Sequence, residues 1–115
     1  MGAAANVVAD AATLLVEGGP PARYDHPVEP LATSFCPTCG SPLFLEIRGW
    51  PQWVYPFASA IDTELPAPPH RVHVRTGERP AWVPPIGSTD DAWFETNTDE
   101  SMVEWHERLG LAIPD

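Results

Sequence analysis

The chain has 115 residues, which is enough for one domain spanning 1–115 and too few for a second of ordinary size. Its basic residues are six arginines, and sixteen aspartates and glutamates bring the net charge to −10, which disfavours binding to nucleic acid and to anionic membranes. The sequence has neither a long apolar stretch for a membrane span nor a basic signal-peptide start, so it predicts a soluble, cytoplasmic protein.

The first part of the chain is expected to form short extended segments. Fifteen prolines and eight glycines interrupt the sequence and favour short strands over long helices. The segment 11–16 is apolar enough for a strand and ends at the Gly18-Gly19-Pro20-Pro21 turn. Two further extended segments, 23–28 and 31–35, are separated by prolines, and the second leads directly into the two cysteines.

The central part of the chain predicts paired strands. Residues 43–47 are apolar on both faces, as expected for a central strand, and a turn at 49–52 allows them to pair with 53–57. Residues 70–75 alternate as a one-sided strand does, with Val72 and Val74 on one face. The opposite face would carry Arg71, His73 and Arg75.

The C-terminal segment 86–115 is an acidic extension in which eight carboxylates accompany a single arginine. It contains the one predicted helix, at about 99–109, where Met102, Trp105 and Leu109 fall on one stripe. Asn97 and Glu100 have the spacing of a capping box, and Gly110 suits the position after the helix. The acidic surface is interpreted as a solvated face, with docking of a basic partner as the alternative.

Both cysteines of the chain lie in Phe35-Cys36-Pro37-Thr38-Cys39-Gly40. A Cys-x-x-Cys pair lets two thiolates bind one Zn²⁺, and structural zinc is almost always four-coordinate. Pro37 stiffens the turn, and Gly40 can take the positive φ that a zinc knuckle often requires. Cys36 and Cys39 are therefore predicted zinc ligands; two metal-free thiols and a redox or disulfide pair are the alternatives, and the strand-like residues after Pro42 argue against a thioredoxin-type helix.

Two thiolates leave a tetrahedral site half complete. A homodimer would bring two Cys-x-x-Cys pairs together across a two-fold axis and make a four-thiolate site. Histidine is the second source of ligands, and the candidates are His26, His70 and His73. In the third alternative no metal binds, and uncovered strand edges cause self-association. A dimer is expected in each case.

Two histidines also suggest a small binding pocket. His70 and His73, with Trp82, would form a pocket for a small anionic or thiol-containing ligand, and Arg71 or Arg75 would pair with its charge. The alternative is that these residues form the exposed polar face of a strand.

From about Leu15 to Trp82 the chain resembles the family of glutathione-dependent formaldehyde-activating enzymes, also called the GFA or CENP-V domain. The resemblance depends on the order and spacing of several short motifs. These are Glu17-Gly18 with Tyr24, then Ser34 to Phe44 around the two cysteines, then Ala60-Ile61-Asp62, Pro69-His70 and Pro80-Ala81-Trp82.

The resemblance implies a mainly β fold, a β-tent (Mss4-like) of short antiparallel sheets with one short C-terminal helix. It also implies zinc as a cofactor and carbon–sulfur lyase-type chemistry on a glutathione or other thiol adduct. In the family, the knuckle that matches Cys36 and Cys39 completes a four-cysteine structural zinc site together with an N-terminal Cys-x-Cys pair. A further cysteine-rich motif holds the catalytic zinc.

The sequence departs from that pattern, because it lacks the N-terminal Cys-x-Cys pair and the catalytic cysteine motif. Only 35 residues precede Cys36, so the chain corresponds to the C-terminal part of such a domain, shortened at its N-terminus. No catalytic residue follows from the resemblance, and activity stays open. The alternative is a non-catalytic β domain, zinc-binding or metal-free, that acts as a binding or dimerisation module.

Overall fold

A computed structural model describes residues 4–111 and contains mainly strands, with one short α-helix near the C-terminus. The mainly β fold class is confirmed. The chain divides into two compact units, and the boundary falls between Pro66 and Ala67. The predicted extension 86–115 lies in the second unit, and its last four residues, 112–115, are outside the described part of the chain.

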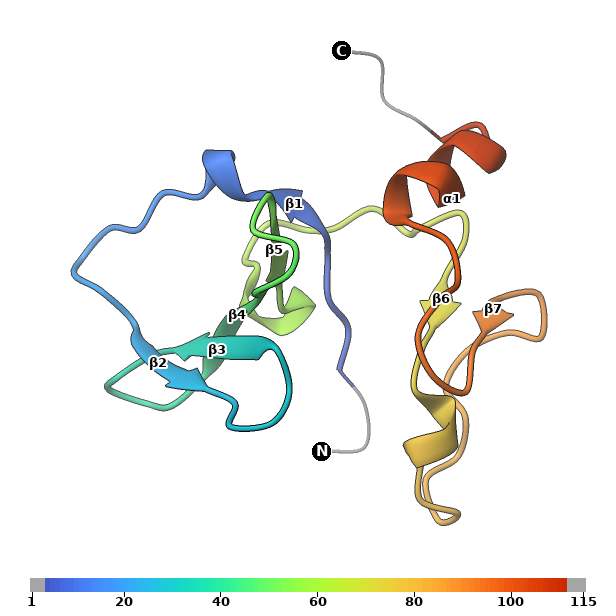
Figure 1. Ribbon diagram of the computed structural model, residues 1–115, viewed down its shortest axis with the longest axis horizontal. Helices are drawn as coiled ribbons and strands as arrows, with labels where there is room; N and C mark the ends of the chain where they lie inside the picture. The colour runs from blue at the N-terminus through green and yellow to red at the C-terminus, as the bar shows by residue number, and fades with distance from the viewer. Residues whose placement is uncertain (1–3, 112–115) are drawn as a thin grey trace. The chain divides into compact units, whose positions relative to one another are not determined.

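The first unit is built on a five-stranded antiparallel sheet (Figure 1). The strand order is β1-β5-β4-β3-β2, so β4 is central, as its apolar residues predict. The bounds are β1 Ala9–Asp10, β2 Ala22–Asp25, β3 Leu31–Phe35, β4 Pro42–Ile47 and β5 Trp53–Pro56. A 3₁₀ turn, Ala58–Ala60, follows β5.

The two longest strands, β3 and β4, form the hairpin that carries the cysteines. Thr33 pairs with Leu45 and Ser34 with Phe44, after which the register shifts and Phe35 pairs with Pro42. The shift adds an irregularity at the strand end next to the Cys-x-x-Cys turn, where a β-bulge commonly bends a strand. β4 in turn pairs with β5 through Leu45 and Tyr55, which confirms the predicted pairing of these strands.

The predicted strand at 11–16 is wrong. Residues Ala11–Thr13 form a 3₁₀ turn, and the chain then runs without regular structure to β2. Asp10 explains the turn, because its side chain accepts a hydrogen bond from the Ala12 backbone N–H at 2.8 Å. An aspartate that caps its own neighbours offers the backbone an alternative to sheet pairing.

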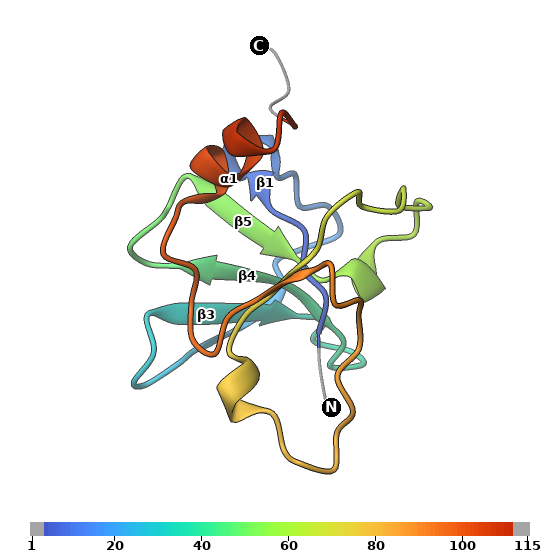
Figure 2. The same cartoon turned by 90° about the vertical axis from the view of Figure 1, so that its right-hand side faces the viewer.

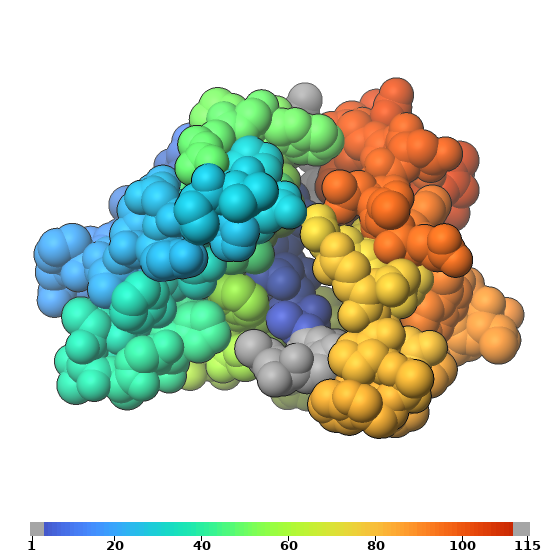
Figure 3. All heavy atoms as spheres, turned by 60° about the horizontal axis from the view of Figure 1, so that its bottom comes forward, coloured from blue at the N-terminus to red at the C-terminus, as the bar shows by residue number. Residues whose placement is uncertain are grey.

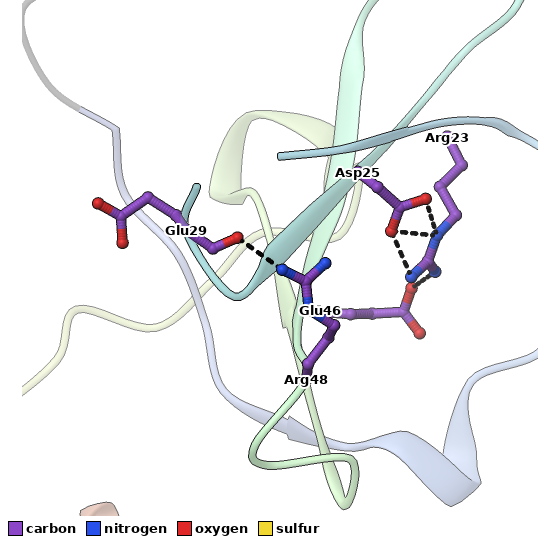
Figure 4. A network of polar contacts seen from close by, with 5 residues as sticks. All are labelled: Arg23, Asp25, Glu29, Glu46 and Arg48. Carbon is purple, nitrogen blue, oxygen red and sulfur yellow. Dashed lines mark hydrogen bonds and ion pairs between the residues drawn. The ribbon is translucent and has the colours of Figure 1, made fainter. Parts of the chain in front are cut away.

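Ala32, a small residue of β3, is flanked by longer side chains on both neighbouring strands. Ala32 is 1% exposed and pairs with Asp25 on one side and Glu46 on the other. Arg23 of β2 makes ion pairs with Asp25 and with Glu46 of β4, so charged side chains reach across β3 (Figure 4). Exposed ion pairs of this kind contribute at most about 1 kcal/mol to the stability of a protein. We therefore infer that these three side chains matter mainly because they cover Ala32.

The second unit has a two-stranded sheet, one 3₁₀ turn and the α-helix. Strands β6, Val72–His73, and β7, Ala92–Trp93, are parallel, so this sheet departs from the predicted antiparallel arrangement. After β6 the 3₁₀ turn Thr76–Glu78 lies beside the segment that follows β7, and the Gly77 N–H donates to the Glu95 carbonyl at 3.2 Å. In Figure 3 this turn is yellow to gold and its neighbour is orange.

The helix α1, Met102–Arg108, confirms the predicted C-terminal helix but begins three residues later than expected (Figure 2). The capping box is formed by Ser101 and Glu104 instead of Asn97 and Glu100. The Ser101 hydroxyl accepts the Glu104 backbone N–H, and the Glu104 carboxylate accepts the Ser101 N–H at 2.7 Å. Trp105, one helical turn after Ser101, is the buried residue of this helix.

Within the described residues, no helix has the length and hydrophobicity that a transmembrane span requires.

Val54 on β5 provides a direct test of the first unit's core, because its side chain is 2% exposed. Replacement by Ala removes two buried methyl groups, and we expect a loss of about 2 kcal/mol in the free energy of unfolding. The matched control is Val28→Ala, since Val28 is 84% exposed and lies outside the strands. Chemical denaturation should leave the control unchanged; equal losses in both variants would contradict this assignment of the core.

Candidate functional site: the cysteine turn

The Cys-x-x-Cys segment forms a tight turn between the central strands β3 and β4. The Cys36 N–H donates to the Ser41 carbonyl at 2.9 Å, and the Gly40 N–H donates to the Cys36 carbonyl at 2.8 Å. Gly40 has a φ of 76°, which is the left-handed conformation that the sequence predicts for it. These bonds hold the backbone around both thiols, so the turn is a fixed part of the hairpin.

The two sulfurs differ in their surroundings. Cys36 is partly buried and Cys39 is exposed, and both are free thiols. The Cys39 Sγ lies 3.1 Å from the Ser41 hydroxyl oxygen. A hydrogen bond with the Ser41 side chain, and then one with its backbone and one with Cys36, lowers the pKa of the Cys39 thiol. The lower pKa favours the thiolate, which is the form that binds metals and attacks electrophiles.

His26 lies on the first unit, but its ring is already engaged. Its Nδ1 accepts backbone N–H groups from Val28 at 3.2 Å and Glu29 at 2.8 Å, and its ring meets Tyr24 edge to face. The imidazole therefore caps the turn before β3, and its Nε2 is the nitrogen that would bind a metal.

His70 and His73 lie in the second unit, so they are on a different compact part of the chain from the cysteines. Among residues 4–111 the structure has no group of three or more His, Cys, Asp or Glu side chains arranged for a metal ion. The suggested partner Trp82 is 82% exposed, with no hydrogen bond or ring contact in the described region. The pocket of His70, His73 and Trp82 stays a prediction.

His73 does have close partners, and no local sequence pattern pointed to them. Its Nε2 lies 2.8 Å from Oδ2 of Asp91, and its ring stacks on Trp93 with centroids 3.8 Å apart. Asp91 is 18 residues away along the chain. Only the parallel pairing of β6 with β7, which places His73 opposite Trp93, brings the three together.

The chain is similar to a protein of Halomonas elongata named "Putative glutathione-dependent formaldehyde-activating enzyme". The two are 43% identical over 96% of this chain and 73% of that protein. The chain belongs to the glutathione-dependent formaldehyde-activating enzyme family. No family model and no solved structure matches it.

The cysteine turn supplies half of the donors that a structural zinc site of this family would need. Cys36 and Cys39 are the right ligand type, and the turn fixes them on one hairpin. A four-coordinate zinc would require two more ligands, and no third metal-binding side chain joins the cysteines within residues 4–111. The two thiols therefore fit zinc by ligand type and supply two of the four ligands that it would need.

Gly40 can be tested against a glycine of the neighbouring turn between β4 and β5. A Cβ at Gly40 would meet nothing within 4 Å, so Gly40→Ala changes only the backbone preference at a φ of 76°. We expect a loss of about 1 kcal/mol in the free energy of unfolding. The control is Gly49→Ala, since that position has equal space and lacks a positive φ. Thermal melting of both should separate them; an unchanged Gly40→Ala variant would show that the turn relaxes.

Proposed function

We propose that this chain acts on the adduct of glutathione and formaldehyde, making or breaking its carbon–sulfur bond. The observation that carries the proposal is the 43% identity over 96% of the chain to a protein whose name says that it activates formaldehyde in dependence on glutathione. The fixed Cys-x-x-Cys turn, which is one of the motifs that carry the family resemblance, supports it.

The proposed reaction adds a thiol to an aldehyde. The glutathione sulfur attacks the carbonyl carbon, a carbon–sulfur bond forms, and the π electron pair of the carbonyl moves to oxygen. The thiol proton ends on that oxygen, which gives S-hydroxymethylglutathione, and no net oxidation or reduction occurs. The catalyst must therefore help a proton to leave sulfur and reach oxygen, which is general acid–base work.

We also propose that Cys36 and Cys39 hold zinc together with the same pair from a second copy of the chain. Two exposed or half-buried thiols on one hairpin turn suit a two-fold arrangement, because a homodimer presents the same surface twice. A zinc bound by four thiolates is a closed site whose role is to stabilise the fold. A reducing cytoplasm, where we place the protein, would keep the thiols available.

The catalytic proposal predicts faster exchange between formaldehyde and its glutathione adduct. Exchange NMR with ¹³C-formaldehyde and glutathione measures the rate of adduct formation and loss at equilibrium. The native protein should raise this rate above that of buffer and of an equal concentration of an unrelated protein. Because adduct formation is also spontaneous, a rate equal to both blanks would reject the proposed enzyme and favour the non-catalytic binding or dimerisation module.

The zinc proposal predicts half a zinc per chain in a dimer, measured on protein purified without chelator or added metal. Elemental analysis gives the zinc content, and native mass spectrometry gives the oligomeric state. Cys36→Ser should lose both the zinc and the dimer, whereas His26→Gln should keep them. One zinc per chain, lost in His26→Gln, would instead indicate a histidine ligand, and a folded parent protein without zinc would overturn the metal site.

A further inference from the structure

The second unit holds an imidazole whose position is fixed by two neighbouring side chains. One face of the His73 ring stacks on Trp93, with an interplanar angle of 9°. Its Nε2 meets the Asp91 carboxylate at 2.8 Å, and the two side chains are 22% and 11% exposed. A histidine held this way by a carboxylate and an aromatic ring keeps a single orientation.

The turn before β7 is shaped around this pair. A Cβ at Gly87 would come within 2.6 Å of His73 Nε2 and 2.7 Å of Asp91 Oδ2, so only glycine allows the backbone to pass there. The Ser88 N–H donates to the same Asp91 oxygen at 3.0 Å. The Ser88 carbonyl accepts the Trp93 indole N–H at 3.0 Å, which ties the stacked ring to the same turn.

The carboxylate determines which imidazole nitrogen is protonated. The hydrogen bond with His73, followed by that from the Ser88 N–H, lowers the pKa of Asp91, so this group stays ionised and accepts only. His73 Nε2 must therefore be the donor. In neutral imidazole the other nitrogen, Nδ1, is then the base, and it has no hydrogen-bond partner among the described residues.

We propose that His73 Nδ1 is the proton acceptor for the thiol of glutathione, with Asp91 orienting the ring. This inference rests on the proposed function. The thiol proton moves to Nδ1 as sulfur attacks the aldehyde carbon, and it is then delivered to the new alkoxide oxygen, which returns the imidazole to its neutral form. The roles are those of a carboxylate–imidazole pair in general acid–base catalysis.

Arg71 adds a reason for an anionic thiol to approach this site. Arg71 directly precedes β6, and its side chain is exposed. Its positive charge contributes to the lowered pKa of Asp91. Within residues 4–111 its guanidinium has no hydrogen bond or ion pair. Glutathione carries a net negative charge at neutral pH, so Arg71 offers a local cation on a chain whose net charge is −10.

The test uses the exchange NMR assay with paired variants. His73→Ala should lower the turnover rate roughly 100-fold, the usual contribution of a general base, and added imidazole should restore part of it after subtraction of a protein-free blank. His106→Gln is the control, since His106 lies on α1, where its Nδ1 is 2.6 Å from the Met102 carbonyl oxygen, and it should keep the parent rate. Chemical rescue separates proton transfer from a purely structural role.

Asp91→Asn and Asp90→Asn form a second pair on adjacent residues. The amide introduced by Asp91→Asn can still accept the Ser88 N–H, so the turn should persist, but the charge that fixes the imidazole is lost. We expect a roughly 10-fold lower turnover rate in Asp91→Asn and none of this loss in Asp90→Asn. ¹⁵N spectra of His73 should show the Nε2–H tautomer in the parent protein and a mixture in Asp91→Asn. Melting curves check that each variant is folded.

Glutathione titration separates failure of this inference from failure of the proposed function. Millimolar glutathione should shift the His73 and Trp93 NMR signals in the parent protein. An active parent whose rate survives His73→Ala would overturn the inference alone. An inactive parent whose His73 signals still move would overturn formaldehyde chemistry and leave a thiol site. An inactive parent with unmoved signals would overturn both.

Discussion

The tight turn at Cys36–Gly40 is the constraint on which the first unit depends. Two backbone hydrogen bonds, from Cys36 to Ser41 and from Gly40 to Cys36, close the chain between β3 and β4. The same bonds set the register of the central hairpin and hold the thiols at its end. Because β3 and β4 pair with every strand except β1 in this sheet, a change in the turn would alter both the sheet and the cysteine site.

The sequence predicted those parts of the fold in which local pattern and long-range packing agree. Residues 31–35 follow a proline and residues 43–47 are mostly apolar, and they form β3 and β4 almost as expected. The segment 11–16 has a similar apolar character but fails to form a strand, because Asp10 supplies a local hydrogen bond that starts a 3₁₀ turn. The helix begins late for a related reason, since Ser101 and Glu104 satisfy each other's backbone N–H groups.

The candidate site was predictable to a similar extent. Both cysteines and the positive φ of Gly40 follow from spacing and residue type alone. His73 was recognised only as a generic candidate, because nothing local connects it with Asp91. Parallel strands need a long connection, so residues that meet on β6 and β7 are distant in sequence, and a short motif cannot reveal them.

The two proposals assign different work to the cysteine turn and to His73, according to the chemistry each can supply. The cysteine turn has one partly buried and one exposed sulfur donor on a backbone held by hydrogen bonds, which suits a structural metal ligand. His73 is hydrogen-bonded to the Asp91 carboxylate through Nε2 and stacks on Trp93, and its Nδ1 has no hydrogen-bond partner among the described residues. This arrangement suits proton transfer. Thiol addition to an aldehyde requires one proton to leave sulfur and reach oxygen. An imidazole held by a carboxylate can carry that proton in both directions, because the same nitrogen accepts it and then gives it up.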